Sequence, residues 1–157
     1  MAVTVLLDTN VLIHAANAAS PVYMLARQLR EQVVGGAIQA CLTPQNLWEF
    51  YAVVTNPRRI DPPLSASEAR REVLLYAETP HIRLIIPRQS SYQRALALLR
   101  QHPVIGKDVF DLYLVATMLD YDVSTIYTEN IHDFRRYPDI EVVNPFAMAK
   151  SSHRSAS

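Results

Sequence analysis

The chain has 157 residues, half of them hydrophobic, and its 15 basic and 15 acidic side chains cancel to a formal net charge of zero. A chain of this length and apolar content fits one domain with a single core, which excludes intrinsic disorder. Electroneutrality excludes a global basic field, so any nucleic-acid binding must use local patches.

In the first half of the chain, short apolar runs alternate with capped helical segments. Residues 3–7 are apolar and rich in β-branched side chains, the pattern of a strand covered on both faces. Ser20 and Thr43 each precede a proline and are expected to be helix N-caps. The expected segments are a strand over 3–7, helices over 10–16 and 21–34, a strand over 38–42 and a helix over 44–56.

The second half continues this alternation. Ser65 and Glu68 have the spacing of a capping box, and Asp108 is expected to cap the most apolar helix of the chain. The expected segments are a helix over 66–78, a strand over 83–86, a helix from 90 or 91 to 101, a helix after Asp108, a strand over 123–128, a turn over 133–136 and a strand over 141–143.

The alternation predicts an α/β fold in three layers, with a central, mostly parallel sheet of four or five strands flanked by helices. Such sheets bind ligands beyond the carboxyl ends of their strands, where the strand order reverses. Asp8 follows the first strand and Thr128 ends the fourth, so a site lies between these two strands if they are neighbours. We expect one domain over residues 1–149 and a disordered, serine-rich tail over 150–157.

Targeting signals are not evident in the sequence. No apolar run is long enough to span a bilayer, and the N-terminal segment lacks the basic start and cleavage site of a signal peptide. The single cysteine, Cys41, is expected to be a buried apolar residue in a reducing compartment. We therefore expect a cytoplasmic protein with no membrane partner.

Three carboxylates, Asp8, Glu49 and Asp111, are each the only charged residue of an apolar run. Such runs are expected to be buried, and an ionised acid in buried sequence is costly unless it is paired or holds a cation. Three such acids indicate a shared site around a metal ion.

Other interpretations stay open for each acid. Asp8 is as well placed to cap the following helix as to act in catalysis, and the two roles are compatible. A buried ion pair with an arginine such as Arg58 or Arg59 is the alternative for Glu49. For Asp111, at the third position of a helix that Asp108 caps, we favour a cation in front of it.

The segment from Thr128 to Phe134 is a polar loop directly after a strand, and it contains Glu129, Asn130 and Asp133. Taken alone, it is an ordinary Asx turn. With three acids expected at the same edge of the sheet, it is the natural fourth wall of a site.

Carboxylates without clustered histidine or cysteine select a hard cation, so we expect Mg²⁺, with Mn²⁺ as a substitute. The five histidines lack ligand spacing and are expected to be surface or ordinary core residues. A carboxylate-bound Mg²⁺ suits phosphodiester hydrolysis. The strongest rival is an aspartyl-phosphate phosphatase, which generally needs a second acid at the position of Asn10.

Four motifs, in this order and spacing, resemble the PIN-domain ribonucleases, specifically the VapC toxins of VapBC toxin–antitoxin systems. They are Leu6 to Leu12 around Asp8, Leu47-Trp48-Glu49-Phe50, Phe110-Asp111-Leu112 with Ala116 following, and Thr128-Glu129-Asn130 with Asp133-Phe134. The resemblance covers nearly the whole chain. It implies a PIN-like fold, endoribonuclease activity on RNA, a homodimer and silencing by a VapB-like antitoxin. The alternative is a catalytically silent PIN-like regulatory module.

By this resemblance, Asp8, Glu49 and Asp111 occupy the acidic positions of the family, with Asp8 and Asp111 as the direct metal ligands. The fourth acidic position of many members is Asn130 here, and Asp133 is the residue that can supply the charge instead. The remaining expected site residues are Thr9, Asn10 and Thr128 as polar supports, and Arg58, Arg59, Lys107, Arg135 and Arg136 as contacts to the RNA backbone.

Overall fold

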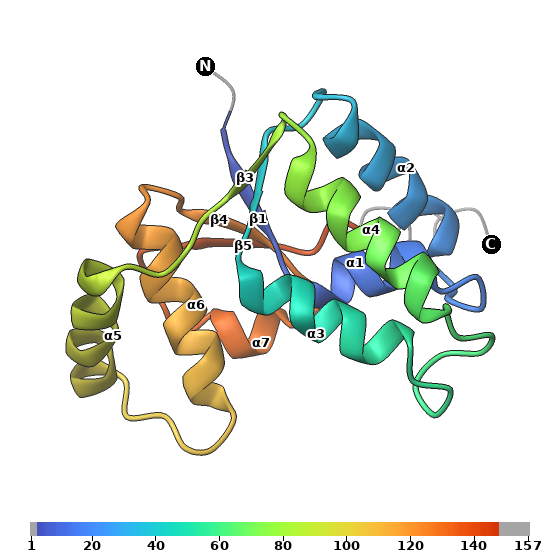
Figure 1. The fold of residues 1–157 in the computed structure, drawn as a ribbon. Coiled ribbons are helices and arrows are strands. Elements are labelled where there is room, and N and C mark those ends of the chain that lie inside the picture. The colour runs from blue at the N-terminus through green and yellow to red at the C-terminus, as the bar shows by residue number, and fades with distance from the viewer. Residues whose placement is uncertain (1–2, 148–157) are drawn as a thin grey trace, which may run out of the picture.

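The protein is described by a computed structural model over residues 3–147, and its centre is a five-stranded parallel sheet (Figure 1). The strands lie in the order β3-β2-β1-β4-β5, and every neighbouring pair is parallel. Their bounds are β1 Val5–Leu7, β2 Ala40–Leu42, β3 Ile82–Leu84, β4 Thr125–Tyr127 and β5 Glu141–Val143. The predicted α/β fold is confirmed. Because β1 and β4 are neighbours, the strand order reverses between them, as the site prediction required.

Helices cover both faces of the sheet. They are α1 Thr9–Ala16, α2 Tyr23–Val34, α3 Pro44–Val54, α4 Ala66–Glu78, α5 Gln89–Gln101, α6 Asp108–Asp120 and α7 Ile131–Phe134. Val5 and Leu7 of β1 pack into one core with α1 to α4, while Leu6 packs into a second core with α5 and α6. Alternate side chains of a strand point to opposite faces, so the three predicted layers are present.

Two of the predicted helix starts are confirmed by their caps. The Thr43 hydroxyl accepts the backbone N–H of Asn46 at the start of α3, and Ser65 forms the predicted capping box with Glu68 at the start of α4. These side-chain hydrogen bonds satisfy backbone donors that would otherwise lack partners in the first helical turn.

Four predicted starts are wrong by one or two residues. Helix α1 begins at Thr9, one residue before its predicted start. Helix α2 begins at Tyr23, because the Ser20 hydroxyl accepts the N–H of Val22 in a turn instead of capping the helix. Helix α6 begins at Asp108 itself, since Lys107 already has helical dihedral angles. Helix α5 begins at Gln89, one residue before the earlier of its two predicted starts. The turn expected over 133–136 is in part the short helix α7.

Cys41 is fully buried, as predicted, and burial raises the pKa of its thiol to about 12. Among residues 3–147, no helix is long and apolar enough to cross a membrane. The tail predicted over residues 150–157 lies outside the described residues.

Candidate active site

Asp8 directly follows β1 and is the N-cap of α1. The same residue therefore caps a helix and lies at the carboxyl edge of the sheet. Its Oδ1 accepts a hydrogen bond of 2.8 Å from the backbone N–H of Thr9. Its Oδ2 accepts from the Thr128 hydroxyl at 2.8 Å and from the Asn10 side-chain amide at 3.2 Å. Because Thr128 follows β4, these bonds join the carboxyl ends of two neighbouring strands and fix the orientation of the Asp8 carboxylate.

Glu49 lies on α3 and is tied to the start of α1. The Thr9 hydroxyl donates to Glu49 Oε2 at 3.0 Å and accepts from the Asn46 amide at 3.2 Å. The Gln45 amide donates to Glu49 Oε1 at 2.8 Å. Asn46 is itself held by the capping box with Thr43, so the start of α3 positions Glu49 beside Asp8's strand end.

The expectation that Glu49 is buried is wrong. Glu49 is exposed, and so is Trp48, of which 65% is accessible to solvent. The apolar side chains that α3 buries are Leu47, Phe50 and Val54, at the spacing of one side of a helix. Trp48 and Glu49 fall on the opposite side, where the apolar character of the run does not imply burial.

Asp111 lies half-buried in the first turn of α6. Burial first, and then the charges of Asp8, Asp133, Asp108 and Glu49, raise the pKa of Asp111 from its ordinary 3.8 to about 7. The pKa of Asp8 is also raised, mainly by burial, with smaller contributions from Glu49 and Asp133. Asp8, Glu49, Asp111 and Asp133 therefore share one electrostatic environment, and we call these four residues the acid cluster.

The two candidates for the fourth acidic position lie differently. Asp133 is half-buried on α7 and contributes to the raised pKa of both Asp8 and Asp111. Asn130 is exposed at the N-cap of α7, and its backbone N–H donates to the Thr128 hydroxyl at 2.9 Å. Asp133 therefore adds negative charge beside Asp8 and Asp111, while Asn130 helps to shape the loop.

A contact beside the acid cluster carried no signal in the sequence. The Nε2 of His14 lies 2.7 Å from Glu129 Oε2, and its Nδ1 lies 2.6 Å from the Ser20 hydroxyl. The backbone N–H of Glu129 also donates to Asn10 Oδ1 at 3.2 Å. His14 therefore connects α1 to the loop after β4.

The predicted basic contacts to RNA lie on separate parts of the surface, and two of them, Arg135 and Arg136, are exposed directly after α7. Arg58 and Arg59 are exposed in the turn beyond the end of α3, and no ion pair within residues 3–147 joins either of them to Glu49. The alternative of a buried ion pair for Glu49 is therefore wrong. Lys107 is exposed at the N-cap of α6, in the turn that precedes Asp111.

The donor set of the acid cluster fits a hard cation. Within residues 3–147, no three or more His, Cys, Asp or Glu side chains are arranged to hold a metal ion by themselves. Mg²⁺, however, takes only one or two carboxylates directly and keeps several waters, so Asp8 and Asp111 would be sufficient. The charge of Asp8 raises the pKa of Asp111, and a divalent cation between them would relieve that repulsion.

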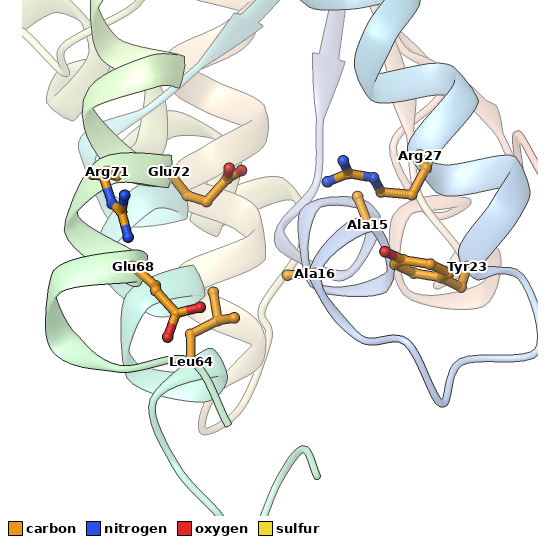
Figure 2. A pocket seen from close by; sticks show the side chains of 8 residues that line it. All are labelled: Ala15, Ala16, Tyr23, Arg27, Leu64, Glu68, Arg71 and Glu72. Carbon is orange, nitrogen blue, oxygen red and sulfur yellow. The ribbon is translucent and has the colours of Figure 1, made fainter. Parts of the chain in front are cut away.

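A hollow of about 360 Å³ lies between α1, α2 and α4 (Figure 2). Figure 2 shows Arg27 of α2 facing Glu72 of α4 across it, and Glu72 also pairs with Arg30 at 2.7 Å. No residue of the acid cluster lines this hollow, so it is separate from the candidate active site.

The PIN domain family matches residues 5–140 of the chain. The chain belongs to the PIN domain family. The match begins in β1, ends just before β5 and includes the whole acid cluster. Ribonuclease VapC48, from two strains of Mycobacterium tuberculosis (CDC 1551 / Oshkosh and H37Rv), is 28% identical over 143 residues, a match that covers 89% of this chain and 96% of that protein.

Solved structures share the fold. The sarcin-ricin loop cleaving toxin VapC20 of Mycobacterium tuberculosis superposes with a TM-score of 0.63 at 14% identity, over 85% of this chain and 95% of that chain. VapBC2 from Rickettsia felis, bound to a DNA fragment from its promoter, superposes with a TM-score of 0.60 at 17% identity. The match covers 89% of this chain and 97% of that chain. These matches confirm the predicted PIN-like architecture.

Proposed function

We propose that this PIN domain is a Mg²⁺-dependent endoribonuclease that acts as the toxin of a toxin–antitoxin module. The observation that carries the proposal is the acid cluster at the carboxyl edge between β1 and β4. A structural ion pair would place a basic side chain against one of these acids, but none of the four ion pairs found within residues 3–147 involves a residue of the acid cluster. Such a concentration of carboxylates favours a cation-binding site over a purely structural one.

Asp8 and Asp111 are the proposed metal ligands, because both are at least half-buried and share one environment. A bound Mg²⁺ would supply Lewis-acid stabilisation of the charge that develops on the phosphate oxygens and would lower the pKa of a coordinated water. The hydrogen bonds to Asp8 from Thr9, Asn10 and Thr128 hold its carboxylate in one orientation before substrate arrives.

Glu49 is the proposed water-positioning residue. Its two oxygens are held by Thr9 and Gln45, yet the side chain is exposed, so each oxygen keeps a lone pair for a water molecule. The exposed Asn130 amide offers a further hydrogen-bonding group at the rim. Asp133 adds negative charge that strengthens attraction for a cation.

The relatives support the toxin assignment. One is named a ribonuclease, another cleaves the sarcin-ricin loop, and a third is a VapBC complex on promoter DNA. By analogy we propose an RNA substrate, a VapB-like antitoxin partner, a homodimer and a cytoplasmic location for this chain.

The rival phosphatase mechanism is disfavoured by the contacts of Asp8. The Asp8 carboxylate accepts hydrogen bonds from Thr9, Asn10 and Thr128. Asn10, at the position where such an enzyme generally carries a second acid, donates one of these bonds. No side chain at that position is available as a general acid.

The decisive experiment incubates the purified chain with total RNA and with a single-stranded oligoribonucleotide in Mg²⁺. We expect internal cleavage that EDTA abolishes and that Asp8→Asn or Asp111→Asn reduces at least about 100-fold. Asp122→Asn is the matched control, because it makes the same chemical change at an exposed residue before β4, on the opposite edge of the sheet. Cleavage that persists in EDTA would contradict the mechanism.

The same proteins distinguish an enzyme from a silent regulatory module. A silent module would fold and bind a partner protein, yet it would neither cleave RNA nor bind Mn²⁺ in calorimetry. An enzyme should bind Mn²⁺ through Asp8 and Asp111, and expression of the wild type, but not of Asp111→Asn, should slow bacterial growth.

A further inference from the structure

A hollow of about 560 Å³ lies beside α7, outside the acid cluster. Its walls come from the end of α5 with the loop that follows, and from α7 with the turn that follows. We call it the basic hollow, and its lining residues are Gln101, His102, Pro103, His132, Arg135 and Arg136.

Every ionisable side chain that lines the basic hollow is of basic type. The chain as a whole has equal numbers of acidic and basic residues, so this concentration is not a consequence of composition. Arg135 is exposed, and none of the four ion pairs found within residues 3–147 involves it. Arg136 makes the longest of those pairs, with 3.7 Å between its Nη2 and Asp108 Oδ2. Both guanidinium groups therefore keep donors for another anion.

The basic hollow begins where the acid cluster ends. On α7, Asp133 belongs to the cluster while its neighbour His132 lines the hollow. On the other side, Arg136 contacts Asp108, whose charge acts on Asp111. The two sites therefore adjoin in two places: along α7, where His132 precedes Asp133, and at the contact between Arg136 and Asp108.

One lining residue of the hollow, His102, is held by an aromatic contact with Tyr137. The ring of His102 packs edge-on against Tyr137, with 5.1 Å between centroids. The pKa of Tyr137 is raised mainly by burial, with Arg136 opposing and Asp111 and Asp108 adding to the shift. Tyr137 therefore contacts one wall of the hollow and lies within electrostatic range of Asp108 and Asp111.

We propose that the basic hollow binds a backbone phosphate of the RNA next to the bond that the acid cluster cleaves. This assignment rests on the proposed ribonuclease function. A polyanion approaching four carboxylates is repelled, and a basic pocket one residue away offsets that repulsion and sets the position of the strand. Arginine guanidinium groups match the geometry of a phosphate and can donate two hydrogen bonds to it.

The test measures binding of a fluorescently labelled single-stranded RNA to the full chain in EDTA, at several salt concentrations. The variant is Arg135→Gln with Arg136→Gln. The control is Arg70→Gln with Arg94→Gln, which removes the same charge at exposed residues of α4 and α5 that do not line the hollow. Each lost contact to a single-strand phosphate should lower the slope of log K against log salt by about 0.7.

For the variant with Arg135→Gln and Arg136→Gln, which we call the hollow variant, the slope of log K against log salt should fall by about 0.7 to 1.4. The slope of the control should change much less. In Mg²⁺, the hollow variant should raise KM while kcat changes little, because the lost contact holds the ground state and the transition state alike. Since Arg136 also pairs with Asp108, Arg135→Gln alone is a second variant that breaks no ion pair within residues 3–147. Equal slopes for both double variants, or a fall in kcat at unchanged affinity, would overturn the proposal.

Inorganic phosphate distinguishes an RNA phosphate from a free one. Phosphate binding that the hollow variant abolishes, together with unchanged RNA binding, would overturn the RNA assignment. The proposed function fails separately: a chain that binds RNA through the hollow but never cleaves it in Mg²⁺ refutes the ribonuclease and leaves the binding site standing.

Discussion

The hydroxyl of Thr128 donates a 2.8 Å hydrogen bond to Asp8 Oδ2 and so joins the ends of two neighbouring strands that are 120 residues apart in the chain. The same hydroxyl oxygen accepts from the Asn130 backbone N–H at 2.9 Å and from the Asn10 amide at 3.2 Å. Thr128 is fully buried, so water cannot replace these bonds if they are lost. One hydroxyl therefore organises both Asp8 and the loop that leads to α7.

Thr128→Val should cost about 1–3 kcal/mol of unfolding free energy, because it leaves buried polar groups without partners in a side chain of nearly equal size. Cleavage should fall about 10- to 100-fold, the usual effect of losing a partner that orients a metal ligand. Thr128→Ser keeps the hydroxyl and is the control. Urea unfolding and the RNA assay measure both effects, and a valine variant as stable and active as the serine variant would contradict the role.

Asp111→Asn should raise stability at pH 8 in EDTA. The pKa of Asp111 is raised from 3.8 to about 7, so the folded state binds the proton more tightly than the unfolded state does. The contribution of this group to folding is therefore fully present below its unfolded pKa and is lost as the pH rises to about 7. Because the asparagine side chain does not ionise, the variant avoids this loss.

The measurement is the unfolding free energy of wild type and Asp111→Asn at pH 4, 6 and 8. The variant's advantage should grow by about 1–2 kcal/mol between pH 4 and pH 8, a value reduced from the full pKa shift because Asp111 is only half-buried. Asp122→Asn should show no such growth. Asp122 is exposed and has a φ of 60°, which asparagine adopts as readily. A constant difference across this range would indicate a structural role for Asp111.

The fold could be predicted because its signals are local. Side-chain caps at Thr43 and Ser65 fixed two helix starts, and apolar runs such as residues 3–7 marked the strands. The starts of α2 and α6 were misplaced because Val22 and Lys107 cap without a side-chain hydrogen bond and so carry no residue-type signal. The alternation of strands and helices predicts a parallel sheet but does not predict the order of its strands. That β1 lies beside β4 is known only from the structure.

The site was only partly predictable, for a different reason. Asp8 and Asp111 are conspicuous because each interrupts an apolar run and each follows a strand or opens a helix. Glu49 was assigned to the interior because a linear run hides which side of a helix each residue occupies. The pair of His14 and Glu129 is separated by 115 residues, and only the packing of α1 against the loop after β4 creates it.

Trp48→Ala should change the unfolding free energy by less than about 1 kcal/mol, because Trp48 is 65% exposed and its removal leaves no cavity. Phe50, on the opposite, buried face of α3, is fully buried and packs edge-on against Tyr76. Phe50→Ala should therefore cost about 3–5 kcal/mol. Chemical unfolding of both variants checks the orientation of α3, and similar losses at the two positions would mean that the helix is rotated.

Mn²⁺ should raise the thermal stability of the wild type and of Asp122→Asn by the same amount, and that of Asp111→Asn much less. A ligand that binds only the folded state stabilises it by RT ln(1 + [L]/Kd), which is about 2.7 kcal/mol at a hundredfold excess over Kd. Asp111→Asn removes one of the two proposed ligands, so its gain should nearly vanish even though its metal-free form is more stable. Unfolding scans in EDTA and in a MnCl₂ series separate these two effects. A parallel rise in all three proteins would place the cation away from the acid cluster.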